Sequence, residues 1–412
     1  MENKSDETDK CLRKNTVSYI SYNVITATLL IFSNGALIQT FLLSMGVSES
    51  KIGYFSSVYN FTQVLTMIFC SLISDRIKNI KKMIALCSLP QIFFYVAMAF
   101  FCIYDANTDT VFITALITLF LLGIFLGIIN VLIYKLPYII MDINSYGRVT
   151  SIIGIFSGIL GVAVSAGVKL LIDSYEYKTV MLLCFVACAV LLIASFAMVM
   201  CLKVVNDGEY DGNEPKKAKF YDVFKHKSFI FLSPANIFRG LAAGITAMIP
   251  VFAVRQMKAD AGMTASMVIV SNVANIVCCF GYMLAMNYIK PNLLCFITSV
   301  VTLVPLIGMA FTYNWMAYLI LYSIYNIGIF GFSMAVPVYV TKIVPYSIMG
   351  SYTSWRMMLT TGGTALGSLL SGVLISKISI AGIMLLAVAL QFFSGLIYGL
   401  YPRLIKIGKC DS

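Results

Sequence analysis

The feature that most constrains this chain is a series of apolar runs about 20 residues long, each bounded by charged or turn residues. A run of this length fits a helix that crosses the hydrocarbon core of a bilayer, which is about 30 Å thick. Of the 412 residues, 60% are hydrophobic and 11% are charged, against roughly 45 to 50% and 25% in soluble domains. We therefore predict an all-α polytopic membrane protein and exclude an ordinary soluble enzyme.

The apolar runs predict twelve transmembrane helices in two sets of six. The first set covers 18–44, 52–73, 83–104, 111–135, 149–172 and 179–202, and the second covers 228–252, 264–286, 292–313, 316–341, 352–375 and 380–401. The polar stretch between the sets contains Gly, Pro and mixed charge, which is typical of a solvated linker. The expected organisation is an N-terminal tail at 1–17, a bundle at 18–202, a linker at 203–227, a bundle at 228–401 and a C-terminal tail at 402–412.

The distribution of Lys and Arg predicts the orientation of the chain. The two tails, the linker and the loops after even-numbered spans hold 22 basic residues, whereas the opposite loops hold six. Basic residues favour the cytoplasmic side of a membrane. We therefore expect a multi-pass protein of the plasma membrane with both termini in the cytoplasm. The polar start of the chain and the lack of a cleavage site after the first apolar run indicate no removable signal peptide.

The two halves of the sequence resemble each other weakly. A shift of 200 residues aligns the stretch from Leu121 with the stretch from Leu321, and it pairs Pro137 with Pro337. Duplicated units of this kind enclose a central binding site in many transporters. The sequence therefore predicts two pseudo-symmetric six-helix bundles.

Charge and cysteine patterns argue against several other functions. The net charge of +11 comes from basic residues between the apolar runs, whereas nucleic-acid binding needs them clustered on one face. The 11 Cys show neither a disulfide framework nor the spacing of metal ligands, and the chain has a single His. No nucleotide-binding loop or catalytic triad is present. We expect no enzyme activity, no metal, no other cofactor and no nucleic-acid partner.

The connection between the second and third predicted spans carries the most specific motif. It reads SLISDRIKNIKK, from Ser71 to Lys82. This stretch resembles the signature GxxxDRxGxxRR that the major facilitator superfamily (MFS) has at the same place, with Asp75 and Arg76 as its central pair. Ser71 and Lys78 replace the two glycines. The resemblance extends over the whole chain and implies a secondary transporter that works by rocker-switch alternating access between two bundles.

The resemblance also implies which residues act as a gate. In that family the acid of the motif engages the partner bundle near the start of the eleventh span and holds the cytoplasmic side closed. We assign gating to Asp75 and Arg76, with Arg148 and Arg356 as charged partners, because these two arginines open corresponding spans of the two halves. Both also fit as residues whose side chains extend to the membrane surface.

Arg239 is the most informative residue within a predicted span. It lies 12 residues beyond Lys227, which places it about 18 Å into a helix and near the midplane of the bilayer. An ionisable residue at this depth usually faces a cavity or a partner. Arg239 could be a structural residue that binds helix carbonyls, or it could line the cavity and contact the substrate. We favour the second role.

No Asp or Glu lies in the middle of any predicted span. A buried Arg without an internal carboxylate suggests that the counter-charge comes from the substrate, for example a carboxylate or phosphate. Asn and Gln with aromatic residues could instead bind a neutral sugar, or hold helices together. Beside Arg239, the candidate substrate-binding residues are the polar and aromatic residues of the spans: Asn34, Gln39, Tyr59, Gln63, Asn236, Asn272, Asn275, Tyr325 and Asn326.

These observations favour a transporter of a small polar metabolite, which is anionic if Arg239 binds it. The alternatives are a sugar carrier or an exporter of drugs or amphiphiles within the same superfamily. The expected partners are the small-molecule substrate and the lipid bilayer, with a coupling ion left open. We expect the chain to act as a monomer.

Overall fold

The computed structural model describes residues 2–73, 77, 79–104, 107–133, 136–140, 146–203, 222–285, 288–344 and 346–407. These residues form helices and short connections, and no strand occurs among them. The all-α prediction is therefore confirmed. By residue contacts the chain divides into two compact units, which we describe separately.

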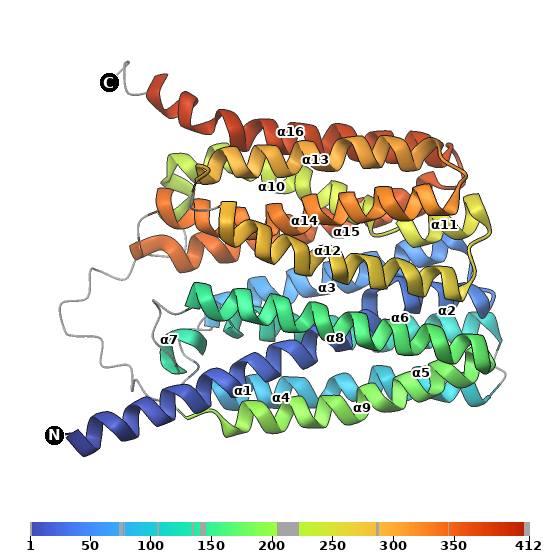
Figure 1. The fold of residues 1–412 in the computed structure, drawn as a ribbon, viewed down its shortest axis with the longest axis horizontal. Coiled ribbons are helices and arrows are strands. Elements are labelled where there is room, and N and C mark those ends of the chain that lie inside the picture. The colour runs from blue at the N-terminus through green and yellow to red at the C-terminus, as the bar shows by residue number, and fades with distance from the viewer. Residues whose placement is uncertain are drawn as a thin grey trace. The chain divides into compact units, whose positions relative to one another are not determined.

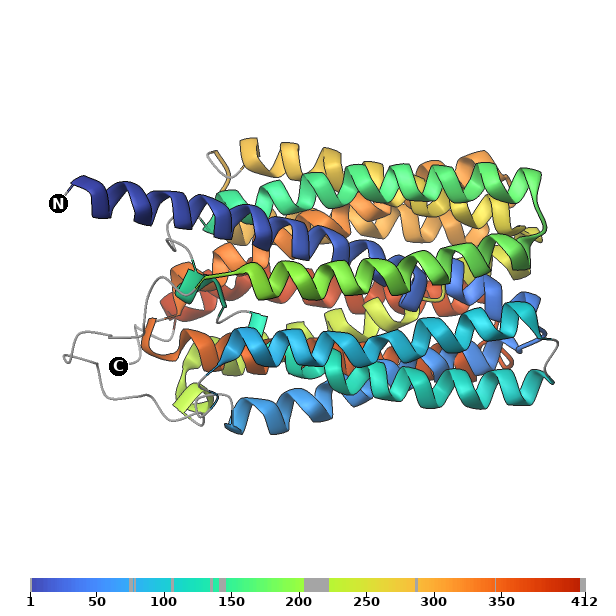
Figure 2. The same cartoon turned by 90° about the horizontal axis from the view of Figure 1, so that it is seen from below.

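The first unit contains residues 1–47 and 62–214. Its helices are α1 (Glu2–Asn34), α2 (Ala36–Ser44), the end of α3 (Glu49–Ile73), α4 (Ile80–Ser88), η2 (Leu89–Gln91), α5 (Ile92–Ile103), α6 (Thr108–Ile133), α7 (Leu136–Ile140), α8 (Tyr146–Ser174) and α9 (Tyr177–Cys201). Helix α1 lies beside α9 and α8 (Figures 1 and 2). Its Asn15 donates to the backbone oxygens of Ile140 and Lys203 at 2.9 and 2.7 Å and accepts from the Lys203 amide. This side chain ties the middle of α1 to the end of α7 and to the residues that follow α9.

The second unit contains residues 48–61 and 215–412. Its helices are the start of α3, η4 (Asp222–Lys225), α10 (Lys227–Thr246), α11 (Ile249–Met257), α12 (Ala261–Ala285), α13 (Pro291–Phe311), α14 (Trp315–Ile343), α15 (Tyr346–Leu374) and α16 (Ile380–Ile407). Helix α10 packs against α15 and α16, and α13 packs against α14 and α16 (Figure 1). Apolar side chains of α10, α13, α14 and α16, together with Tyr352 of α15, form a buried core.

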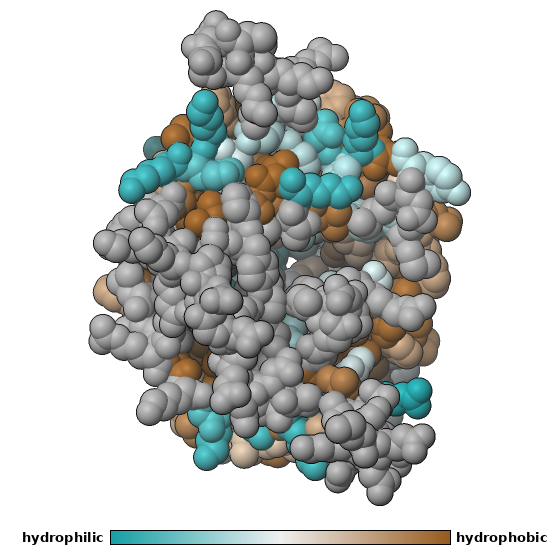
Figure 3. Space-filling model, turned by 90° about the vertical axis from the view of Figure 1, so that its left-hand side faces the viewer, coloured by the Kyte–Doolittle hydropathy of each residue, from teal (hydrophilic) through white to brown (hydrophobic). Residues whose placement is uncertain are grey.

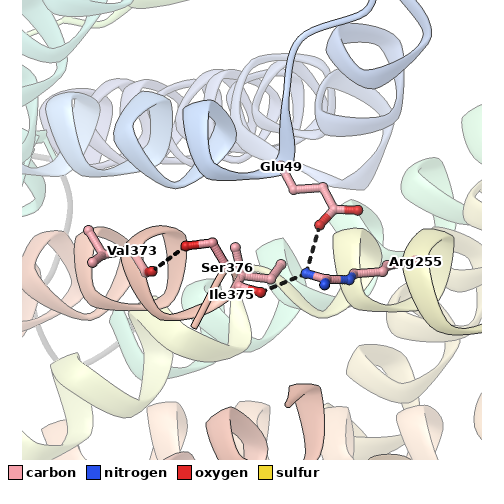
Figure 4. Close-up of polar contacts among 5 residues, drawn as sticks. All are labelled: Glu49, Arg255, Val373, Ile375 and Ser376. Atoms are coloured by element: carbon pink, nitrogen blue, oxygen red, sulfur yellow. Dashed lines mark hydrogen bonds and ion pairs between the residues drawn. The ribbon is translucent and has the colours of Figure 1, made fainter. Parts of the chain in front are cut away.

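Helix α3 is continuous from one unit into the other, and its first half belongs to the second unit. Near its start, Glu49 accepts a hydrogen bond from Arg255 of α11 at 3.1 Å, and the same Arg255 nitrogen donates to the Ile375 carbonyl at 2.7 Å (Figure 4). One turn along α3, Gly53 meets Gly372 of α15 so closely that an added Cβ would lie 2.5 Å from the Gly372 Cα. These contacts hold the start of α3 to the ends of α11 and α15.

Two glycines let α10 and α15 approach each other closely. A Cβ added at Gly240 would lie 2.2 Å from the Thr360 carbonyl oxygen, and one added at Gly244 would lie 2.1 Å from that of Thr364. Because the contact moves forward along both helices together, α10 and α15 run in the same direction. Small residues at such spacing allow close helix packing in membranes.

Three predicted spans are each divided into shorter helices in the structure, and each still forms one candidate membrane span, as predicted. The span 18–44 is divided at Gly35, where a Cβ would lie 2.6 Å from the Ile31 carbonyl oxygen. The span 83–104 contains the 3₁₀ turn η2 at Pro90. In the span 228–252, α10 ends at Thr246, and α11 begins at Ile249 with Pro250 in its first turn. A proline has no N–H to continue an α-helix, which explains the second and third interruptions.

Eleven helices of the described residues are long and apolar enough to cross a membrane, and α3 is not among them. Polar side chains such as Ser56, Asn60 and Gln63 lower the hydropathy of α3. With α3 the number of long helical segments equals the twelve predicted. Hydrophilic side chains lie among apolar ones on the described surface at the end shown in Figure 3, as expected where helix ends meet water.

Candidate functional site

Arg239 lies within the second unit, on α10, and it is 7% exposed. Its guanidinium carbon is 4.4 Å from the centre of the Phe332 ring of α14, a cation–π contact. Its Nη1 atom is buried and has no hydrogen-bond partner among the described residues. Arg239 is also the one charged residue among the buried residues that the structure describes. The ring therefore covers one face of the guanidinium, and one N–H edge is left without an acceptor.

Asn236 lies one turn before Arg239 and has its polar atoms bound within the bundle. Its Nδ2 donates to the Leu232 carbonyl at 2.8 Å, and its Oδ1 accepts from the Tyr398 hydroxyl of α16 at 2.8 Å. The Tyr398 ring in turn packs on Phe332, with ring centres 5.3 Å apart. The Tyr398 hydroxyl and the Phe332 ring thus connect Asn236 to the surroundings of Arg239.

Tyr325 and Asn326 lie next to each other on α14. Tyr325 is buried and stacks on Tyr322 with ring centres 6.3 Å apart. Asn326 donates to the Tyr322 carbonyl at 2.7 Å and accepts from Ser271 of α12 at 2.9 Å. Tyr325 therefore belongs to an aromatic pair within α14, and Asn326 joins α14 to α12.

The two candidate asparagines of α12 make contacts within their own helix. Asn272 donates to the Val268 carbonyl at 2.9 Å, and the Oδ1 atom of Asn275 accepts a weak hydrogen bond from the Cys279 thiol at 3.7 Å. Both bonds join residues one turn apart in α12.

The candidates on α2 and α3 are buried, and they are divided between the units. Gln63 of the first unit accepts from Asn130 of α6 at 3.0 Å. Gln39 of α2 is also in the first unit, whereas Tyr59 of α3 belongs to the second. The Gln63 and Asn130 pair is a polar contact between α3 and α6 within the first unit.

Several predicted positions lie outside the described residues. Asp75 and Arg76 are not described, and the same holds for the side chains of Asn34 and Arg148. The family resemblance places the partner of Asp75 near the start of the eleventh span. That span is α15, which begins at Tyr346, so the backbone N–H groups that the helix itself does not bond belong to this first turn.

Arg356 of α15 is partly buried. Its Nη2 contacts the Met357 sulfur at 3.7 Å, and its Nε is buried and has no hydrogen-bond partner among the described residues. Arg356 lies one turn before Thr360, which meets Gly240 of α10, so its backbone is level with Asn236.

Sequence reasoning missed Phe332, Tyr398 and Asn130. An Asn within the run GIINVL, from Gly127 to Leu132, stands out as a polar residue in an apolar span, so Asn130 could have been found. Phe332 and Tyr398 could not, because aromatic residues are frequent in every span and their roles depend on tertiary packing. Among the described residues, no cluster of His, Cys, Asp and Glu could hold a metal ion.

Known structures share the fold of this protein over most of the chain. The nucleoside transporter NupG, in a single-residue variant, has a TM-score of 0.70 at 15% identity, with 93% of this chain and 98% of that chain covered. The D-xylose-proton symporter has a TM-score of 0.75 at 11% identity, covering 94% and 97%. A bacterial homologue of the human lysosomal transporter Spinster has a TM-score of 0.66 at 14% identity, covering 96% and 97%.

The sequence comparison identifies the family directly. Comparison with curated protein sequences gave no significant match. Residues 19–368, however, match the family profile described as Major Facilitator Superfamily. That match covers most of the chain and confirms the resemblance first indicated by the motif from Ser71 to Lys82. The chain belongs to the Major Facilitator Superfamily, a family of membrane transporters.

Proposed function

We propose that this protein transports a small anionic metabolite by alternating access, and that Arg239 binds the anionic group of the substrate. The observation that carries this proposal is the buried Nη1 of Arg239, which has no hydrogen-bond partner among the described residues. A charged group buried without an acceptor is costly. An anion that accepts from this N–H edge would remove that cost.

The surroundings of Arg239 support an anion more than a cation or an apolar molecule. Phe332 holds one face of the guanidinium at 4.4 Å, and Asn236 is hydrogen-bonded to Tyr398. Arg239 is therefore kept in place while its N–H edge stays available. A guanidinium offers paired N–H donors that match a carboxylate or a phosphate.

A neutral sugar or nucleoside is the second candidate. The pair of Gln63 and Asn130 offers the amide chemistry that such substrates need. NupG is named a nucleoside transporter, and the other neighbour is named a D-xylose-proton symporter. Their sequence identities to this chain, 15% and 11%, support a shared fold alone. Both polar atoms of the Asn236 amide, one turn before Arg239, are already bound to protein atoms, and therefore we favour the anion.

Thermal stabilisation of the purified, full-length protein across a metabolite panel tests the proposal. The panel contains monocarboxylates, dicarboxylates and phosphate esters, with sugars and nucleosides as neutral controls. Ligand at 100 times its Kd stabilises the folded state by about 2.7 kcal/mol, which is readily measured. The proposal predicts that anions stabilise the protein and that neutral compounds do not. Stabilisation by a sugar or nucleoside, with no response to any anion, would contradict it.

A further inference from the structure

The buried ring of Tyr398 on α16 lies at the centre of a group of polar side chains from three other helices. Its hydroxyl donates to Asn236 of α10, and its ring packs on Phe332 and Tyr339 of α14 at 5.3 and 6.2 Å between ring centres. The Arg239 guanidinium also packs on the Phe332 ring. Tyr398 therefore contacts Tyr339 directly and is connected to Arg239 through Phe332.

Arg356 of α15 reaches the same group from the helix that packs most closely on α10. Gly240 meets Thr360, which lies one turn after Arg356, and the two helices run in the same direction. This register places Arg356 level with Asn236, about one helical turn from Arg239 along the axis.

Three of these side chains each have a buried polar atom without a hydrogen-bond partner among the described residues. The atoms are Nη1 of Arg239, Nε of Arg356 and the hydroxyl of Tyr339. All three carry a hydrogen to donate, and two of them belong to cations. No Asp or Glu lies in the middle of any predicted span. The cluster thus has an excess of donors and positive charge, contributed by α10, α14 and α15.

We propose that Arg356 and Tyr339 extend the Arg239 site, so that it takes a compact dianion such as a phosphate monoester or a dicarboxylate. This inference rests on the proposed function, because it assumes that Arg239 binds an anion. Two guanidinium groups match two negative charges, whereas a monoanion leaves one of the arginines without a counter-charge. Tyr339 supplies a further donor for a ligand oxygen. Arg356 then determines the preference of the site for a dianion over a monoanion.

The experiment compares anions of different charge on the purified, full-length protein. The probes are inorganic phosphate and succinate as dianions and acetate as the monoanion, all at pH 8 and equal ionic strength. Apparent affinity is measured from the concentration dependence of the unfolding temperature. We expect at least one dianion to bind the wild type about 10-fold or more tightly than acetate, the difference of one charge-assisted bond. A response to phosphate alone indicates a phosphorylated ligand, and a response to succinate alone indicates a dicarboxylate.

Variants assign the selectivity to residues. Arg356→Gln should remove the advantage of the dianion and leave acetate affinity within about threefold, whereas Arg356→Lys should keep most of the advantage. Tyr339→Phe should weaken dianion binding by roughly 3- to 10-fold. Arg255→Gln removes an arginine bound to Glu49 and to a carbonyl, so it is the matched control and should change none of these affinities.

Two results would overturn the inference, and they differ from a failure of the proposed function. If Arg356→Gln keeps the preference for dianions, or weakens acetate as much as the dianions, Arg356 is not the second cation of the site. If the wild type binds acetate through Arg239 without preferring dianions, the site is monoanionic and the proposed function stands. If no anion binds, or if Arg239→Met leaves all three affinities unchanged, the proposed function itself is wrong.

Discussion

Substitution of Arg239 separates a substrate contact from a structural role. A charge-assisted hydrogen bond contributes about 1.5 to 3 kcal/mol, so Arg239→Ala and Arg239→Met should weaken anion binding by roughly one to two orders of magnitude. Arg239→Lys keeps the charge but loses the forked geometry, and its loss of affinity should be smaller.

The stability of the Arg239→Met variant follows from two opposing contributions. Loss of the cation–π contact with Phe332, at 4.4 Å, costs about 0.5 to 2 kcal/mol. Removal of the buried N–H that has no acceptor among the described residues recovers about 1 to 3 kcal/mol. The methionine side chain preserves much of the packed volume. The free energy of unfolding should therefore stay within about 1 to 2 kcal/mol of the wild type.

The assay measures ligand affinity and unfolding temperature on the same purified preparations. A structural arginine that binds protein groups would behave in the opposite way, since removing one partner of a buried pair costs about 3 to 5 kcal/mol. Unchanged affinity together with a large fall in the unfolding temperature would therefore refute the reasoning. It would also remove the main argument for an anionic substrate over a neutral sugar.

Three further predictions test the topology, the gate and the helix packing. In a Cys-free background, a membrane-impermeant thiol reagent outside the cell should label a cysteine at Thr108 and not one at Gly212; labelling at 212 would reverse the orientation. Asp75→Asn should lower transport and increase cytoplasmic accessibility without loss of folding, and wild-type values for both would exclude the gating role. Gly244→Ala should lower the free energy of unfolding by about 1 to 3 kcal/mol, the cost of overpacking, because its Cβ would lie 2.1 Å from a carbonyl oxygen. Gly281→Ala, where a Cβ meets nothing within 4 Å, is the control and should be neutral, so equal effects would argue against the close contact of α10 and α15.

The helical fold was predictable because apolar length alone identifies a span. The interruption near Pro90 was readable in principle, because proline lacks the N–H that continues an α-helix. Proline alone does not locate such a break, however, since Pro234, Pro305 and Pro337 lie inside continuous helices. The division at Gly35 was not, because it depends on a local backbone approach to Ile31. The grouping of residues 48–61 with the second unit could not be predicted from the sequence either, because it depends on tertiary contacts such as that of Glu49 with Arg255.

The candidate site was predictable in its central residue and not in its surroundings. Arg239 was identified because a charge deep in an apolar run is rare whatever the tertiary structure. Its neighbours Phe332, Tyr339 and Tyr398 come from helices far along the chain, and nothing in their local sequence distinguishes them from the other aromatic residues. Asn272 and Asn275 looked equally suitable as ligands, yet both use helix-internal contacts. A polar residue in a predicted span is a reasonable candidate for a binding site. Tertiary packing, however, determines whether its polar atoms remain available to a ligand.

Uptake by proteoliposomes tests the central claim most directly. Purified wild-type protein and the Arg239→Met variant are reconstituted at equal amounts, and uptake of the radiolabelled anion that best stabilises the wild type is followed over time. We predict saturable uptake by the wild type and a loss of at least tenfold at low substrate concentration in the variant, in proportion to its loss of affinity. Saturable uptake of a neutral sugar or nucleoside that Arg239→Met leaves intact, with no uptake of any anion, would contradict the account.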